Sequence, residues 1–251
     1  MAETVSFIES VAFPAAPAVF REAETAAIAA SFKGGRQALV VDSQLAEFNT
    51  TVPSAVRPAI SYGLLLGQLA TDKALAGVTD PMKWFATYND VMGKIGWLST
   101  GAEFSEQKIS DVNVELHKAI IPVLAAVLGP AAAASSIIIA ALKGLESMNQ
   151  KSPWITLFQE RSATVKGAKF ATSFVDAGEG GGALLKTVFF GFEANQAFTQ
   201  ILFLKISNSG AAVRGARSEM QLGAQVIKDT GDALAKKVAP FIVENIKNID
   251  I

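Results

Sequence analysis

Residues 119–142 constrain the fold most strongly, because about two dozen successive residues there carry no formal charge. Roughly 20 apolar residues suffice to cross the hydrocarbon core of a bilayer. Pro122, Gly129 and Pro130 divide the run, however, into pieces of about ten residues, each too short to span. The sequence therefore predicts two buried helices in a hairpin. A hairpin that enters lipid after a trigger is the alternative, and the soluble character of the remaining chain disfavours a permanent membrane anchor.

After Pro153 the hydrophobic period changes to two, which is typical of β-strands. Short polar or glycine-rich links separate segments that are apolar, β-branched and aromatic, and this arrangement predicts an antiparallel meander. Residues 213–222 are compatible either with a further strand or with the start of the last helix. The four predicted strands are residues 154–160, 168–176, 184–193 and 200–208.

Helical patterns dominate the rest of the chain. Gly34 and Gly35 end a predicted helix over residues 20–31, and Asp80-Pro81 has the form of an N-cap followed by the first helical position. Residues 39–49 are ambiguous between strand and helix, whereas residues 97–109 are compatible with a first strand. The other predicted helices are residues 59–75, 82–93, 112–128, 132–148 and 218–247.

Together these elements predict an α+β protein in which helical layers cover an antiparallel sheet. The sheet is expected to have about four to six strands, mostly within residues 154–222, and to be followed by a C-terminal helix. No long polar linker divides the chain. We therefore expect a single domain over residues 1–251, with a helical N-terminal part over about residues 1–150.

The composition excludes several classes of protein. The chain contains 22 basic and 23 acidic residues, and neither sign forms the stripe that nucleic-acid-binding proteins show. It has no cysteine, which removes disulfides, thiolate metal sites and cysteine nucleophiles. Glu3 and Glu9 stand where a secretory signal needs a basic segment before an apolar one. A soluble protein without a cleavable signal is expected, cytoplasmic until lysis or a dedicated secretion system delivers it to a target membrane.

Few residues are candidates for catalysis or cofactor binding, and no enzyme activity, metal or cofactor is predicted. The single histidine, His117, lies in an amphipathic segment and is expected to be structural or exposed. Residues 178–183 match the letters of a dinucleotide-binding loop, but a strand-like segment follows them, which favours a hairpin loop. A dispersed carboxylate active site stays open, although the acids near the strands are expected to form a solvated rim. These acids are Glu103, Glu106, Asp111, Glu160, Asp176 and Glu193.

Residues 112–222 resemble the cytolytic δ-endotoxin (Cyt) family of insecticidal proteins. The stretches VNVELHKAIIPVLAAVLG and SSIIIAALKGLESMN resemble two successive helices of that family, and PWITLFQE, LLKTVFFGFE and QILFLKISNSG resemble its sheet strands. The first hundred residues and the tail over residues 218–251 lie outside the resemblance. It implies an antiparallel sheet wrapped by helices, direct binding to phospholipid, self-association, and loss of membrane integrity without catalysis.

The favoured function is therefore that of a membrane-active, toxin-like protein, either pore-forming or membrane-disrupting, with phospholipid as its partner. The alternative is a non-enzymatic protein that binds an apolar ligand or assembles with copies of itself. Adjacent aromatic residues in residues 184–193 are expected to point to opposite faces of a sheet buried on both sides. The candidate lipid-contacting residues are Ile120, Ile121, Val123, Leu124, Ile137, Ile138, Ile139, Leu142, Phe189, Phe190 and Phe192.

Overall fold

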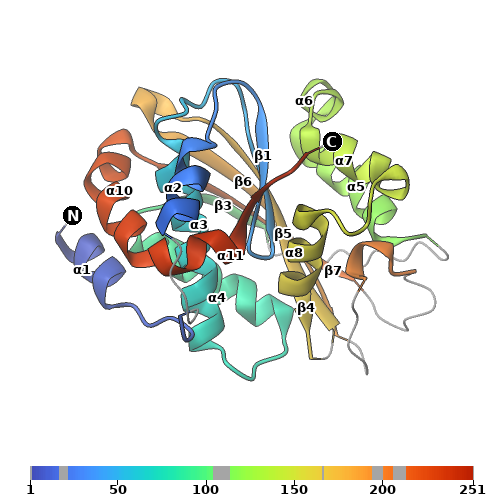
Figure 1. Ribbon diagram of the computed structural model, residues 1–251, viewed down its shortest axis with the longest axis horizontal. Coiled ribbons are helices and arrows are strands. Elements are labelled where there is room, and N and C mark those ends of the chain that lie inside the picture. Colours follow the sequence, from blue (N-terminus) through green and yellow to red (C-terminus); the bar gives the residue numbers. More distant parts are fainter. Residues whose placement is uncertain are drawn as a thin grey trace.

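An eight-stranded sheet with helices on both faces forms the centre of the computed structural model (Figure 1). The structure describes residues 2–16, 22–103, 114–165, 167–193, 200–205 and 213–250. The strand order is β3-β7-β6-β5-β2-β1-β8, with β4 paired to β5. The strands are β1 Gln37–Val41, β2 Gln44–Phe48, β3 Leu98–Glu103, β4 Ala163–Thr164, β5 Gly167–Ala177, β6 Ala183–Glu193, β7 Arg214–Leu222 and β8 Ile246–Asn248.

Two helical layers cover the sheet, and each is built from a different part of the chain (Figure 1). The first layer contains α1 Ala2–Ser10, α2 Glu22–Ala30, α3 Arg57–Ala74, α4 Pro81–Lys94, α10 Ala224–Val238, η4 Ala239–Phe241 and α11 Ile242–Asn245. The second layer contains α5 Leu116–Leu128, α6 Pro130–Ala134, α7 Ile137–Gly144, η1 Leu145–Ser147, α8 Pro153–Ser162 and η3 Ile201–Phe203.

The long hairpin of β5 and β6 is buried on both faces, so that successive side chains enter different cores. Phe189 packs in the first layer, where its ring lies 4.4 Å from that of Phe85. Phe190 packs in the second layer, where its ring lies 5.2 Å from that of Phe170. Because side chains alternate across a strand, this arrangement follows directly from the run of aromatic residues. The prediction that adjacent aromatic residues point in opposite directions is confirmed.

Local signals in the sequence placed several elements correctly. The α+β class, helix α5 and the helical segment near the C-terminus are confirmed, whereas the helix predicted over residues 132–148 is divided into α6, α7 and η1. Asp80 is the N-cap of α4, its carboxylate accepts a hydrogen bond from Met82 N at 2.9 Å, and Pro81 is the first helical residue. Residues 178–182 form the loop between β5 and β6, where Gly180 and Gly181 have positive φ. The hairpin-loop interpretation of these glycines is therefore correct.

Two predicted strands are wrong. Residues 154–160 belong to helix α8, in which Pro153 occupies the first position. The buried residues Trp154, Ile155, Leu157 and Phe158 recur at the spacing of one helical face, which strand-like composition conceals. Residues 201–203 form the 3-10 helix η3 instead of a strand, and residues 206–208 lie outside the described part of the chain.

The sheet also differs from the prediction in its make-up. It is mixed, because β2 runs parallel to β5 while the other pairs are antiparallel. Residues 1–150 are not wholly helical, since they contribute β1, β2 and β3. All residues of β1 and β2 are buried, so the alternation that identifies a strand is missing there. Residues 214–222 form β7, and the C-terminal helix α10 begins only at Ala224.

Close packing of α4 on β6 yields a stability prediction. A Cβ atom added at Gly191 would lie 2.3 Å from Cβ of Pro81, whereas one at Gly215 would meet its nearest atom at 3.5 Å. We expect Gly191→Ala to lower the free energy of unfolding by about 1–3 kcal/mol, as overpacking does. Gly215→Ala is the matched control and should cost less than about 0.5 kcal/mol. Urea denaturation of both variants provides the measurement, and equal stabilities would contradict the described packing.

Candidate functional site

The uncharged segment folds as a hairpin of α5, α6 and α7, whose apolar side chains face the sheet. Ile120, Leu124, Ile138, Ile139 and Leu142 are buried in one cluster with residues of β1, β2, β5 and β6. Ile121, Val123 and Ile137 are partly buried beside it. The candidate residues Phe190 and Phe192 share this face of the sheet, whereas Phe189 lies on the other face.

Two of the three residues expected to divide the hairpin do so, Gly129 and Pro130, whereas helix α5 continues through Pro122. Pro122 lies within α5, Gly129 ends α5 with φ 76°, and Pro130 begins α6. Ser136 then caps α7 by accepting a hydrogen bond from Ile139 N at 3.2 Å. Among the described residues, no helix combines the length and apolarity required to cross a membrane.

One buried carboxylate ties the start of α7 to the sheet. Glu47 of β2 is 1% exposed, and its Oε2 accepts hydrogen bonds from Ser136 Oγ at 2.7 Å and Ile138 N at 3.0 Å. Its Oε1 accepts from Arg36 Nη1 at 2.8 Å. A carboxylate at a helix N-terminus is stabilised by the helix dipole and by free backbone N–H groups. Glu47 is therefore the polar contact that positions α7 on β2.

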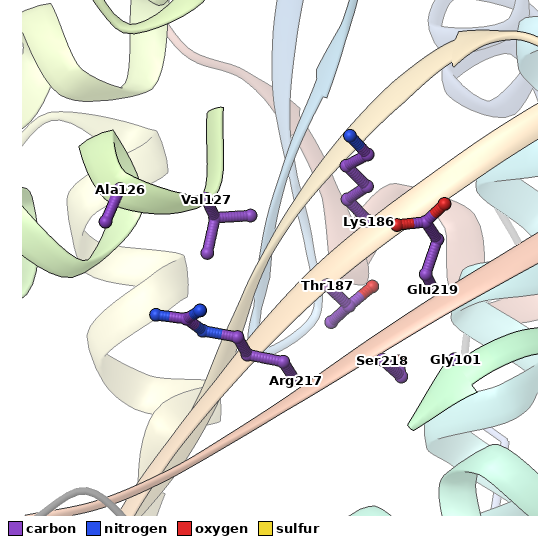
Figure 2. A pocket seen from close by; sticks show the side chains of 8 residues that line it. All are labelled: Gly101, Ala126, Val127, Lys186, Thr187, Arg217, Ser218 and Glu219. Carbon is purple, nitrogen blue, oxygen red and sulfur yellow. The ribbon is translucent and has the colours of Figure 1, made fainter. Parts of the chain in front are cut away.

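A hollow of about 350 Å³ opens between the C-terminal end of α5 and the β3, β6 and β7 strands (Figure 2). On the sheet side, Lys186 of β6 lies opposite Glu219 of β7 in the strand register. Figure 2 shows the Arg217 side chain reaching from β7 towards Ala126 and Val127 of α5. The lining residues are Gly101, Ala126, Val127, Lys186, Thr187, Arg217, Ser218 and Glu219.

The hollow combines two cations with one anion and an apolar wall. Among the described residues, Lys186 and Arg217 make neither an ion pair nor a side-chain hydrogen bond. A guanidinium group matches two oxygens of a phosphate, and an ammonium group adds a point charge. Ala126 and Val127 offer the opposite surface to an apolar group. Chemically, the hollow therefore fits an amphiphile that carries a phosphate.

A second hollow, of about 310 Å³, lies between α3, α8 and α11 and contains a buried acid. Asp42, at the turn between β1 and β2, has φ 53° and is 4% exposed. Burial, and secondarily the charge of Asp72, raises the pKa of Asp42 to about 6. Arg161 Nε lies 3.6 Å from the Asp42 carboxylate, and Lys169 Nζ lies 2.9 Å from that of Asp72. These charges are paired with one another, so we interpret this hollow as structural.

His117 is buried, and two acids lie near it, Glu115 and Glu146. Neither is among the acids expected at the rim of the sheet. His117 Nδ1 lies 2.8 Å from the carbonyl oxygen of Leu202, its Nε2 lies 3.7 Å from Glu115 Oε2, and one carboxylate oxygen of Glu146 lies within 4.8 Å of a ring nitrogen. Hydrogen bonding to Lys118 lowers the pKa of Glu146. Of the acids expected at the sheet rim, Glu160, Asp176 and Glu193 lie on separate elements, α8, β5 and β6. The Glu103 side chain, Glu106 and Asp111 lie outside the described part of the structure.

Sequence reasoning missed the charged residues that the fold brings together. Lys186 and Arg217 are 31 positions apart, and they meet because β6 pairs with β7. Lys186 has a signal in the sequence, a charge within the largely apolar strand β6, whereas Arg217 lies in the polar strand β7 and has none. Glu47 gives the same signal in β2. An isolated charge of this kind indicates a specific partner or an uncovered part of the sheet.

No protein-family model and no curated protein matches the chain. The activated Cyt2Ba monomer from Bacillus thuringiensis subsp. israelensis aligns with 71% of this chain and 96% of its own, at 15% identity and a TM-score of 0.36. A structure described as delta-endotoxin aligns with 72% and 82%, at 17% identity and a TM-score of 0.34. The Evf virulence factor aligns with 98% and 91%, at 11% identity and a TM-score of 0.33. Solved structures of the family that residues 112–222 resemble are thus among those found, and the functional assignment rests on the chain's own geometry.

The raised pKa of Asp42 predicts a pH dependence of stability. The folded state binds the proton more tightly than the unfolded state, so the free energy of unfolding should fall as pH rises from about 4 to above 6. Asp42→Asn removes this titration, and its stability relative to the parent should rise by up to about 3 kcal/mol across the window. Denaturant unfolding at pH 4.5 and 7.5 provides the measurement. A constant difference between the two proteins at both pH values would show that Asp42 is not desolvated.

Proposed function

We propose that this protein is a non-enzymatic, toxin-like protein that binds anionic phospholipid and disrupts the membrane with its α5 to α7 hairpin. One observation carries the proposal: a hairpin without charge over residues 119–142 lies directly beside a hollow with two cations, Lys186 and Arg217, that have no ion-pair partner among the described residues. The hollow supplies the chemistry for a headgroup phosphate, and α5 supplies the adjacent apolar surface. Both elements are needed for a phospholipid, which is anionic at one end and apolar at the other.

Headgroup binding supplies the driving force that the hairpin itself lacks. Its apolar side chains are already buried against the sheet, and burial of apolar surface contributes roughly 25 cal/mol per Å² whether the partner is protein or lipid. Transfer of the hairpin to lipid therefore gains little by itself. We propose that a lipid whose phosphate contacts Lys186 and Arg217 binds more tightly when α5 has moved away from β6 and β7, because its acyl chains can then enter the space between α5 and the sheet; this difference in affinity shifts the equilibrium towards detachment.

Helix length determines how the hairpin meets the bilayer. Helix α5 has 13 residues and α7 has 8, which correspond to lengths of about 20 and 12 Å. Both are shorter than the hydrocarbon core of about 30 Å. We therefore propose that the helices lie in the interface with their apolar faces towards the acyl chains, as amphipathic helices do. Disruption then comes from crowding of one leaflet, and self-association of the protein on the surface increases it.

Charge reversal in the hollow tests lipid binding. Lys186→Glu combined with Arg217→Glu should weaken binding to phosphatidylglycerol vesicles at least tenfold, because each reversal replaces attraction by repulsion. Lys83→Glu combined with Lys228→Glu is the matched control, since it changes the net charge equally at exposed positions outside the hollow. Vesicle co-sedimentation provides the measurement. Equal losses of vesicle binding in both double variants would show that the hollow is no specific lipid site and that the overall charge of the protein determines binding.

Removal of the Glu47 carboxylate tests detachment of the hairpin. Glu47→Ala leaves Ser136 Oγ and Ile138 N without their acceptor, so dye release from vesicles should become faster while vesicle binding is unchanged. Gly191→Ala is the control, because it destabilises the packing of the opposite helical layer. The rates of dye release of Glu47→Ala and Gly191→Ala should be compared under conditions in which both variants have lost the same free energy of unfolding. If both variants accelerate release equally, general instability is the cause. If neither variant nor the parent releases dye, the alternative of an apolar-ligand-binding or self-assembling protein is favoured.

A further inference from the structure

We propose that Glu115, His117 and Glu146 form a binding site for a divalent metal ion of the Zn²⁺ type at the base of the hairpin. One ligand atom of each residue lies within 4.8 Å of the others, and His117 Nε2 is 3.7 Å from Glu115 Oε2. Glu115 is the N-cap residue of α5, His117 is in its first turn, and Glu146 is in η1 directly after α7. The site therefore joins the two ends of the hairpin.

The orientation of His117 is that of a metal ligand. Its Nδ1 lies 2.8 Å from the carbonyl oxygen of Leu202, and a carbonyl oxygen can only accept, so Nδ1 carries the proton. In the neutral ring Nε2 then holds the lone pair that a metal ion requires, and Nε2 makes no hydrogen bond among the described residues. The ring is 1% exposed and packs edge-on against Phe203. Metal-bound histidines are held in the same way, by a hydrogen bond from the second ring nitrogen to a carbonyl or carboxylate.

A cation already lies between the carboxylates of Glu115 and Glu146, namely the ammonium group of Lys118. Glu115 Oε2 is buried and accepts no hydrogen bond from the described residues. Lys118 Nζ lies 3.3 Å from this oxygen and donates to Glu146, so the ammonium group stands where a metal ion would balance the two carboxylates. Lys118 is 48% exposed and has a flexible stem, so it can move into solvent when a metal ion enters. Metal and ammonium thus compete for the same position.

The donor set selects the class of metal. One imidazole nitrogen and two carboxylate oxygens suit Zn²⁺, and Co²⁺ as its spectroscopic substitute, better than Ca²⁺, which takes six to eight oxygens. Three protein ligands leave a fourth position for water. The single histidine of the chain limits this type of site to one per molecule.

The metal would also affect the hairpin, a consequence that rests on the proposed function. His117 and Leu202 connect the site to η3, so a bound ion links α5, η1 and η3. Detachment of the hairpin would break the contact between His117 and Leu202, which holds the imidazole ring in the orientation that the ion needs. We therefore expect Zn²⁺ to slow dye release from vesicles.

Titration of tag-free protein with Zn²⁺, by calorimetry and by thermal unfolding, tests the site. We expect one equivalent to bind and to raise the Tm, and Co²⁺ to give visible absorption bands. Glu146→Gln should weaken binding at least tenfold; this residue is 60% exposed, so the variant is expected to fold. His117→Gln should do the same, and Lys118→Met should strengthen binding because the competing ammonium is removed.

Several results would overturn the inference. If neither the parent nor Lys118→Met binds Zn²⁺, or if Glu146→Gln binds as tightly as the parent, the cluster is an ion pair around Lys118 and not a metal site. Binding by titration does not involve vesicles, so it decides the site even if the protein releases no dye and the proposed function fails. If the protein binds Zn²⁺ and releases dye at an unchanged rate, the link to the hairpin is wrong while the site stands.

Discussion

Burial of the β5–β6 hairpin on both faces is the constraint from which the rest of the structure follows. Each of these strands has 11 residues, most of which are buried, and their apolar side chains enter both layers. Two helical layers are therefore required, and the chain supplies them from different segments. The uncharged hairpin belongs to the second layer, where it meets β1, β2 and the central strands. Its apolar character is explained by this position before any membrane is considered.

Polar contacts in the second layer are few and concentrated at particular points. Glu47 holds the N-terminus of α7, the Glu115 cluster lies at the base of the hairpin, and Lys186 with Arg217 lies beside the end of α5. Apolar packing is nondirectional, so these contacts determine where the hairpin sits on the sheet. A ligand that changes any of them changes the balance between the docked and the detached hairpin. Phosphate and metal would act on this balance in opposite directions.

Features that depend on residues adjacent in the sequence could be predicted. Asp80-Pro81 starts α4, the glycines of residues 178–183 turn the central hairpin, and Gly129-Pro130 separates α5 from α6. The parallel pairing of β2 with β5 joins residues more than 120 positions apart, and no local pattern encodes it. Helix α8 was mistaken for a strand because its residues are aromatic and β-branched. The hollow and the Glu115 cluster could not be predicted either, because they contain residues that are distant in the sequence and that only the fold brings together.

Movement of the hairpin relative to the sheet is the central claim, and a distance measurement tests it most directly. The chain has no cysteine, so spin labels can be placed on engineered cysteines at Ala140, an exposed residue of α7, and at Val165, which is 81% exposed beside β5. A second pair, Val78 and Val165, reports on the rest of the fold. With anionic vesicles, we expect the distance from 140 to 165 to lengthen and broaden while the distance from 78 to 165 stays constant. Unchanged distances in vesicle-bound protein that releases dye would contradict the account, because the intact fold would then be the disrupting species.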